Sequence, residues 1–385
     1  LFMGFDEFLN QLPEDDDATI NYASLLELSG LTGPEADEFG QLWLEWTSER
    51  VGDIVDRMVG LSNEQPDVEF ETIFKQGLLH PSANVRVSAL KGLEESDDRT
   101  LIKPLCEMLK TDPMVEVRAA AAIPLAYLSA MAQTGKLGLR YREALIGVLY
   151  GVLEDVREVQ DVKLKALEAV SVFSGDRLAP FIEEAWSSGD CEAKQSSLFA
   201  MGRTSDPRWV EHVLTDLEHG SVAVRYEATM AMGELCDEEH LRALESSLDD
   251  EDLTVQLAAI SAVERIGGEV AQNLLELKLV SPEPRVVELV QRALQTMKNE
   301  EDLDEVVTQE MARSMFGAGD TLPGIDTEGY EPAEIEGWAN LPDPSEVDDF
   351  GTGVTEEAEE LGLDRGDPFD IDLPPEDPWD HEENF

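Results

Sequence analysis

The feature that most constrains this chain is a two-residue signature that recurs at a fixed step along the sequence. Four copies follow one another at intervals of 31 residues, beginning at Ala193, Val224, Val255 and Val286. One step before them lies Val162, and two earlier copies, Val85-Arg86 and Val117-Arg118, are 32 residues apart. A fixed period of this length is typical of stacked helical units, none of which can bury its apolar side alone. The sequence therefore predicts an all-α solenoid.

Each unit is expected to contain a first helix, a polar turn and a second helix that begins at the signature. The step from Val117 to Val162 is 45 residues, so that unit holds an insertion of 14, centred on residues 131–136. Gly202, Gly233 and Gly267 follow the apolar stretches of second helices, where a left-handed C-cap favours glycine. We therefore expect these glycines to end their helices.

Residues 1–77 do not carry the signature. Within them, Pro34 begins a long helical pattern that reaches Leu61 and is broken at Gln65-Pro66. Terminal units of a solenoid must cover an apolar face that would otherwise be exposed. The sequence thus predicts a helical N-terminal cap region at 1–77 and a repeat solenoid at 78–299.

The last part of the chain, residues 300–385, has a different composition. Residues 301–385 contain 28 acidic and two basic residues, and 300–385 contain eight of the 19 prolines and nine of the 28 glycines. Such a stretch cannot bury enough apolar surface to offset the entropy of ordering, which predicts a disordered acidic tail. Aromatic residues interspersed among the acids suit an interaction tail, and a purely solvating tail is the open alternative.

The charge of the whole chain bears on its partners. The 28 basic residues stand against 84 acidic ones, a formal net charge of −56. This field repels phosphate backbones and anionic membranes, so we expect no nucleic acid or membrane partner. Basic proteins and peptides fit electrostatically, while solubility alone or adaptation to high salt explains the same charge.

Three separated cysteines, Cys106, Cys191 and Cys236, suggest reduced core residues. With no apolar run of about 18 residues and no leader pattern, we expect a cytoplasmic location.

The motifs at 112–118 and 220–233 give the chain a family resemblance. A polar turn, a Val-Arg pair and an alanine-rich second helix resemble the HEAT repeat, in particular its short phycobilisome-lyase-type variant, across the solenoid. The resemblance implies a right-handed superhelix of helix pairs. It also implies a structural ladder between repeats, in which the turn aspartate Asp112 and the arginine Arg118 match the family pattern. Arg86 and Arg225 match the arginine, but His80 and His219 stand where the acid is expected.

Two classes of enzyme belong to the family that this chain resembles, and the residues present bear differently on each. Deoxyhypusine hydroxylase places His-Glu pairs at the start of its second helices, whereas this chain has Tyr226-Glu227 there. The resemblance therefore gives no di-iron site, and we expect no catalytic, metal-binding or cofactor-binding residues. Bilin lyases of the phycobilisome type share the repeats, so a tetrapyrrole-handling or other enzyme-associated role stays as the alternative.

These observations favour a non-enzymatic scaffold that docks a protein or peptide, expected to be basic, on the concave face of its second helices. The side chains expected to contact the partner are Phe199, Tyr226, Glu227 and Met230. The acidic tail would recruit basic partners or fold back onto the ladder arginines and mask the surface. An acidic chaperone or nucleic-acid mimic for basic clients is a further alternative, and the oligomeric state is left open.

Overall fold

The computed structural model describes residues 5, 8, 22–65 and 67–299, and those residues contain helices and no strand. The α-helices are α2 (Tyr22–Leu25), α3 (Gly33–Leu42), α4 (Ser48–Glu64), α5 (Glu71–Gly77), α6 (Ala83–Gly92), α7 (Ile102–Thr111), α8 (Val115–Gln133), α9 (Leu139–Glu154), α10 (Gln160–Val170), α11 (Ala179–Ser187), α12 (Cys191–Thr204), α13 (Val210–Asp216), α14 (Val222–Leu235), α15 (Glu245–Leu248), α16 (Leu253–Ile266) and α17 (Gly268–Glu276). The 3-10 helices are η1 (Leu26–Leu28), η2 (Trp43–Glu45), η3 (Arg99–Leu101), η4 (Ser171–Phe173), η5 (Pro207–Trp209), η6 (Glu238–Leu244) and η7 (Leu277–Val280). Residues 284–299 are also helical. The acidic tail predicted at 300–385 lies outside the described residues.

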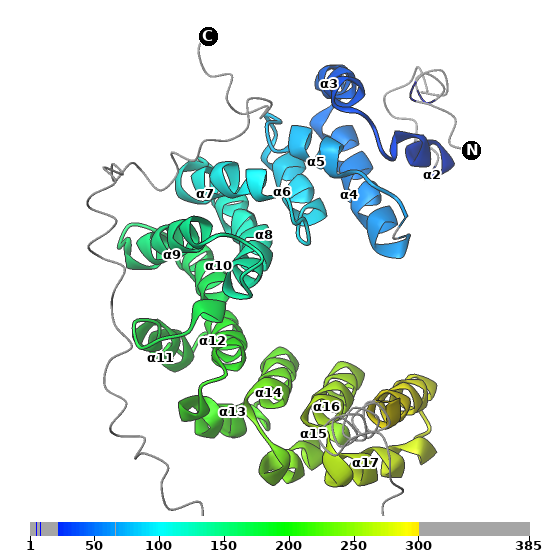
Figure 1. Ribbon diagram of the computed structural model, residues 1–385, viewed down its shortest axis with the longest axis vertical. Coiled ribbons are helices and arrows are strands. Elements are labelled where there is room, and N and C mark those ends of the chain that lie inside the picture. The colour runs from blue at the N-terminus through cyan, green and yellow to red at the C-terminus, as the bar shows by residue number, and fades with distance from the viewer. Residues whose placement is uncertain (1–4, 6–7, 9–21, 66, 300–385) are drawn as a thin grey trace, which may run out of the picture. The chain divides into compact units, whose positions relative to one another are not determined.

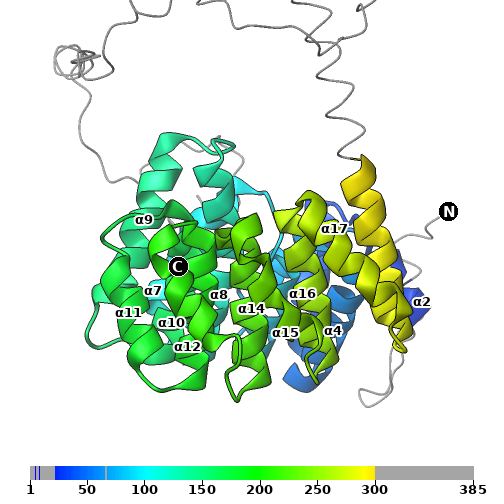
Figure 2. The same ribbon diagram turned by 90° about the horizontal axis from the view of Figure 1, so that it is seen from below.

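The helices are arranged in two layers. The second helices, α4, α6, α8, α10, α12, α14 and α16, form one layer in which each helix contacts the next (Figures 1 and 2). From α5 to α16, each first helix packs against the second helix that follows it in the chain. The signature pair lies near the start of each second helix. The predicted α-solenoid of HEAT-like helix pairs is therefore confirmed.

The pair α7–α8 shows how the sequence builds one unit. In α7, Ile102, Leu105 and Leu109 recur at helical spacing and are buried, as expected for the apolar stripe of an amphipathic helix. In α8, Val117 of the signature is fully buried, and the small Ala121 beside it allows neighbouring helices to approach closely. The core of the unit thus lies between its two helices and the second helices on either side.

The N-terminal region is more divided than the sequence suggested. The pattern from Pro34 to Leu61 forms two helices, α3 and α4, separated by η2. Thr47 accepts a hydrogen bond from the Arg50 backbone N–H at 3.3 Å and so caps the start of α4. The boundary expected at residue 77 falls between α5 and α6, which form one pair. Because α4 packs on α6, the stack of second helices begins before the first signature copy.

The insertion predicted around residues 131–136 lengthens the helices on both sides of it. Helix α8 spans 19 residues and α9 spans 16, joined by a short turn. By length and composition alone α8 could cross a membrane, but half of that stretch is buried within the protein. It packs against α6, α7, α9 and α10. We therefore regard α8 as a core helix of the array.

The predicted C-caps at Gly202 and Gly233 are wrong. Both residues lie inside their helices, α12 and α14, and neither has a positive φ. A Cβ at Gly202 would lie 3.1 Å from the Ala231 Cα, and one at Gly233 would lie 2.8 Å from the Ala262 Cα. These glycines thus allow the close approach of consecutive second helices. Gly267, with φ of 73°, does end α16 as expected.

The cysteines do not all lie in the core. Cys106 on α7 is buried, and its burial raises the pKa of the thiol to about 12. Cys191 is exposed, and Cys236 is half-buried. All three are free. The prediction of a core position is therefore confirmed only for Cys106.

Candidate partner-binding surface

The ladder arginines connect consecutive repeats through the turns before the second helices. Arg86 donates to both carboxylate oxygens of Asp112, at 3.0 and 2.9 Å, and to the backbone carbonyl of His80 at 2.9 Å. Arg118 donates to the Asp112 carbonyl at 2.8 Å and to both oxygens of Glu158, at 3.0 and 2.8 Å. Asp112 thus holds one arginine through its side chain and the next through its backbone.

The same arrangement recurs further along the chain. Arg225 donates to both carboxylate oxygens of Asp250, at 2.7 and 2.9 Å, and to the His219 carbonyl at 3.0 Å. The hydrogen bond from Arg225 lowers the pKa of Asp250 below its usual value. Between these pairs, Lys194 takes the arginine's place and contacts both oxygens of Asp216 at 3.1 Å.

The acid of each rung therefore comes from the following repeat. The histidines before Arg86 and Arg225 contribute their backbone carbonyls instead of side-chain acids. Asp112 and Arg118 do not pair through their side chains. Each ladder arginine thus already holds a carboxylate and a carbonyl. The expected masking of these arginines by the acidic tail involves residues 300–385, which lie outside the described residues.

A different set of side chains forms the surface of the second-helix layer. Phe199, predicted to contact a partner, lies on α12, and Met230 lies on α14 one repeat later. Two register positions, six and ten residues after the first residue of the six signatures from Val85 to Val255, together with Tyr226 on α14, define what we call the second-helix face. Its residues are Lys91, Ile123, Glu168, Phe199, Met230 and Ser261 at the first position, and Glu95, Tyr127, Val172, Arg203, Glu234 and Arg265 at the second.

Aromatic side chains are exposed on this layer. Tyr127 on α8 is 39% exposed, and Phe199 and Tyr226 are each 37% exposed. Large aromatic side chains on a surface are typical of protein interfaces. Of the four residues predicted to bind a partner, Tyr226, Glu227 and Met230 lie on α14, whereas Phe199 lies on α12, the preceding second helix.

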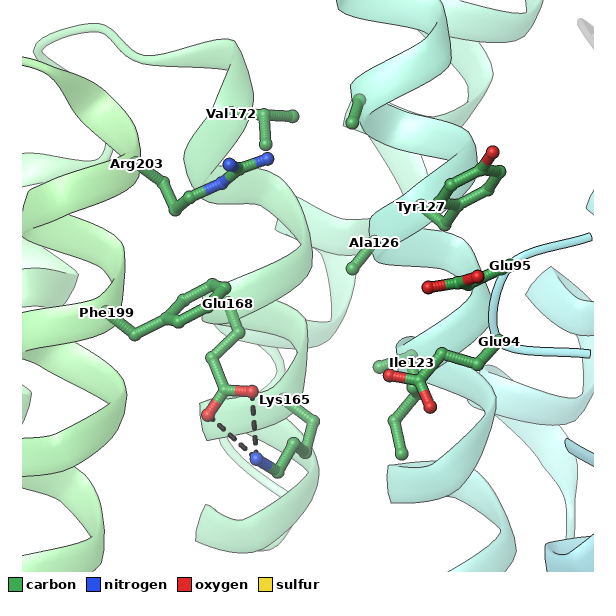
Figure 3. Close-up of a pocket in the computed structure, with 12 residues that line it drawn as sticks. Glu94, Glu95, Ile123, Ala126, Tyr127, Lys165, Glu168, Val172, Phe199 and Arg203 are labelled. Atoms are coloured by element: carbon green, nitrogen blue, oxygen red, sulfur yellow. Dashed lines mark hydrogen bonds and ion pairs between the residues drawn. The ribbon is translucent and has the colours of Figure 1, made fainter. Parts of the chain in front are cut away.

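The face is hollowed between α8, α10 and α12. The hollow has a volume of about 390 Å³, and its residues are Glu94, Glu95, Ala122, Ile123, Ala126, Tyr127, Ala130, Lys165, Glu168, Val172, Phe199 and Arg203. Figure 3 shows Tyr127, Glu94 and Glu95 on one side of the opening and Phe199 and Glu168 on the other. We call it the α8–α12 hollow. The successive second helices α8, α10 and α12, with η4 at the end of α10, contribute side chains from the same register positions.

A polar cluster forms the lower part of one wall. Lys165 contacts both oxygens of Glu168 at 2.8 Å (Figure 3). The Ser196 hydroxyl also donates a hydrogen bond to Glu168, at 2.5 Å. Glu227 on α14 lies close enough to interact with this cluster. Its burial, together with the charge of Glu168, raises the pKa of Glu227 to about 7. Glu227 therefore changes its charge near neutral pH.

The second register position carries a chain of ion pairs on the next helices. Glu234 on α14 lies 3.9 Å from Arg203 on α12 and 3.6 Å from Arg265 on α16. The glutamate side chain is 17% exposed, so it is held between the two arginines. This chain of charges connects three second helices across the face.

The side chains of the described part offer no group of three or more His, Cys, Asp and Glu residues placed to hold a metal ion. The half-buried Glu227 stands at the position where deoxyhypusine hydroxylase is expected to have a His-Glu pair, but the charged groups that act on the pKa of Glu227 are Glu168 and Lys165. Two carboxylates and a lysine are a poor donor set for iron.

Several contributors to the surface were not singled out from the sequence. Ile123 and Glu168 occupy the register position of Phe199, so the repeat period alone could have identified them. Glu94 and Glu95 follow α6 in a loop, and their position on the hollow depends on how α6 packs against α8. The ladder acid Glu158 lies 40 residues after Arg118, beyond the insertion, where no fixed spacing leads to it.

Comparisons with known proteins bear on the family. The HEAT-repeat family matches residues 178–264 and 210–295. No curated protein matches the chain. Among solved structures, a designed armadillo repeat protein is 17% identical, over 51% of this chain and 99% of its own, with a TM-score of 0.34. Human deoxyhypusine hydroxylase is 18% identical, over 69% and 97%, with a TM-score of 0.32. Importin beta is 13% identical, over 72% of this chain and 42% of its own, with a TM-score of 0.40.

At these identities and TM-scores, the solved structures say nothing about activity or partners. The sequence match covers the helices from α11 to α17, and the same layered helix pairs continue toward the N-terminus as far as α5. A repeat solenoid of this kind is a fold typical of protein-interaction scaffolds. The match to the HEAT-repeat family thus spans residues 178–295, and the described residues form a HEAT-like repeat solenoid.

Proposed function

We propose that this protein is a non-enzymatic scaffold or adaptor that docks a protein or peptide on its second-helix face. The observation that carries the proposal is the exposure of Tyr127, Phe199 and Tyr226 on three helices of one layer. Truncating aromatic side chains commonly costs protein interfaces more binding energy than other substitutions.

The charge of the face supports the same proposal. Of its twelve register positions, three are acidic and three are basic, whereas the whole chain has 84 acidic and 28 basic residues. Interface centres are enriched in aromatic residues, methionine and arginine. The second-helix face shares this enrichment and has no net charge over its twelve register positions, and the chain's remaining acidity would steer basic partners toward it.

The acidic segment 300–385 has a supporting part in this proposal. With 28 acidic and two basic residues over 301–385, it would recruit basic partners by long-range attraction, which falls as salt rises. Because the ladder arginines are already paired, this segment would act on the partner and not on the ladder.

Site-specific photo-crosslinking in native lysate tests the proposal. A photoreactive phenylalanine analogue replaces Tyr226 in the full chain, and a matched protein carries it in place of Glu211, an exposed residue of the first helix α13. We expect a discrete crosslinked protein from position 226 and none from position 211.

Equal crosslinking at both positions, or crosslinking at Glu211 alone, would contradict docking on the second-helix face. A tetrapyrrole bound by the purified chain, with no protein crosslinked at Tyr226, would favour the chromophore-handling alternative instead.

A further inference from the structure

The α8–α12 hollow combines an apolar floor with an unbalanced charge at its edge. Ala122, Ala126 and Ala130 recur at four-residue intervals along α8 and line the hollow. Phe199 faces them from α12, as Figure 3 shows for Phe199 and Ala126. An alanine floor beside an aromatic ring leaves room for a large apolar side chain from outside the protein.

The charges within the hollow differ in whether they are already balanced. Glu168 is held by Lys165 and Ser196, and Arg203 is directed toward Glu234. Glu94 and Glu95 are exposed, and within residues 22–65 and 67–299 neither carboxylate forms an ion pair. The two adjacent carboxylates at the edge are therefore the acidic groups of this site that no ion pair balances, whereas Arg203 shares the Glu234 carboxylate with Arg265.

We propose that the α8–α12 hollow anchors a partner segment that places one large apolar side chain on the alanine floor and a neighbouring lysine or arginine against Glu94 and Glu95. This inference rests on the proposed scaffold function and specifies which part of the second-helix face holds the partner, and by which chemistry. The apolar contact supplies most of the affinity, because surface ion pairs contribute little by themselves.

The charge of the chain and the apolar floor of the hollow support this choice of ligand. An acidic segment would meet Glu94 and Glu95 uncompensated and would also be repelled by the net charge of −56. A basic segment lacking an apolar side chain would leave the floor and Phe199 in contact with water. The site therefore favours a segment with both features over a segment with either one.

Selection of displayed random peptides against the full chain tests the inference. The selected peptides should be enriched in a large aliphatic or aromatic residue next to lysine or arginine. Fluorescence anisotropy then measures the affinity of the most enriched peptide for the full chain and for its variants. Circular dichroism of each variant shows that the helices are retained.

Two variants and two matched controls locate the peptide. Phe199→Ala should weaken binding about tenfold or more, as for an interface anchor. The double variant Glu94→Gln/Glu95→Gln should weaken it roughly fivefold at low salt, and the difference should vanish at high salt. Leu277→Ala, at a site 69% exposed on η7, and the double variant Glu107→Gln/Glu211→Gln on first helices should bind as the unchanged chain does.

Other outcomes separate the inference from the proposed function. Peptides that lose affinity with Tyr226→Ala but not with Phe199→Ala would overturn the anchor and leave docking on the second-helix face intact. Enrichment of apolar residues without a cation, or of acidic peptides, would overturn the assigned chemistry. Binding that no substitution on the second-helix face affects would overturn both.

Discussion

At the scale of single residues, the links between repeats depend on acids and arginines that are far apart in sequence. Arg86 and Arg225 could be recognised from the signature, because the position after its first residue recurs with the period. Their acidic partners could not be recognised from a spacing within one unit, since Asp112 and Asp250 belong to the next turn. A pairing rule that reaches across units would have found these two, but not Glu158 beyond the insertion.

Replacing one ladder acid should destabilise the array. In Asp250→Asn the charge that faces the buried Arg225 is lost, and the side chains of this pair are only 8% and 10% exposed. We expect the free energy of unfolding to fall by about 1–3 kcal/mol in urea denaturation. The control Asp176→Asn removes a carboxylate that is 90% exposed and paired with Arg208, and should leave stability unchanged. An equal loss in both variants would show that the ladder has no special role.

Glu227 should make stability depend on pH near neutrality. Its pKa is raised from 4.5 to about 7 by burial and by Glu168, so the folded chain binds a proton there that the unfolded chain has released. This contribution to stability is complete below about pH 4.5 and is lost as the pH rises through about 7. The variant Glu227→Gln cannot release this proton and so does not lose stability in this way. In urea denaturation, the free energy of unfolding of the variant relative to the unchanged chain should therefore rise between about pH 4.5 and 7 and stay constant at higher pH. A difference that stays constant with pH would contradict the raised pKa.

At the scale of helices, the second helices approach one another closely at Gly202 and Gly233. The sequence placed both glycines near helix ends and favoured a capping role, because glycine is common at C-caps. The structural role depends on what lies opposite, which is Ala231 for Gly202 and Ala262 for Gly233. Periodicity predicts which residues are helical, but the distance between two helices depends on pairs of residues that periodicity does not relate.

A methyl group at the close approach should destabilise the helix pair. In Gly233→Ala the new Cβ would lie 2.8 Å from the backbone of Ala262, which cannot move as a side chain can. We expect a loss of about 1–3 kcal/mol in the free energy of unfolding, measured in urea. The matched control is Gly147→Ala in helix α9, where a new Cβ would meet nothing within 4 Å. Its free energy of unfolding should rise by about 0.5–1 kcal/mol, because alanine leaves the unfolded chain less flexible than glycine does. A gain in both variants would contradict the close approach.

At the scale of the whole molecule, the repeat period was enough to predict the solenoid and the start of its second helices. The period could not show that α3 and α4 extend the stack, because these helices lack the signature. It also could not show which side chains of the second helices stay exposed. Phe199 and Met230 share a register position, yet of the two only Phe199 lines the α8–α12 hollow, together with Ala122, Ala126 and Ala130 of α8.

The most direct test of the proposed docking surface is salt-stepped affinity capture from native lysate by three forms of the protein. These are the full chain, the double variant Phe199→Ala/Tyr226→Ala and a chain ending at Asn299. If the second-helix face is the docking surface, a discrete partner binds the full chain and the chain ending at Asn299, and is lost with the double variant. A partner that the double variant retains, and that is lost when residues 300–385 are removed, would contradict docking on the helices and assign binding to the acidic segment.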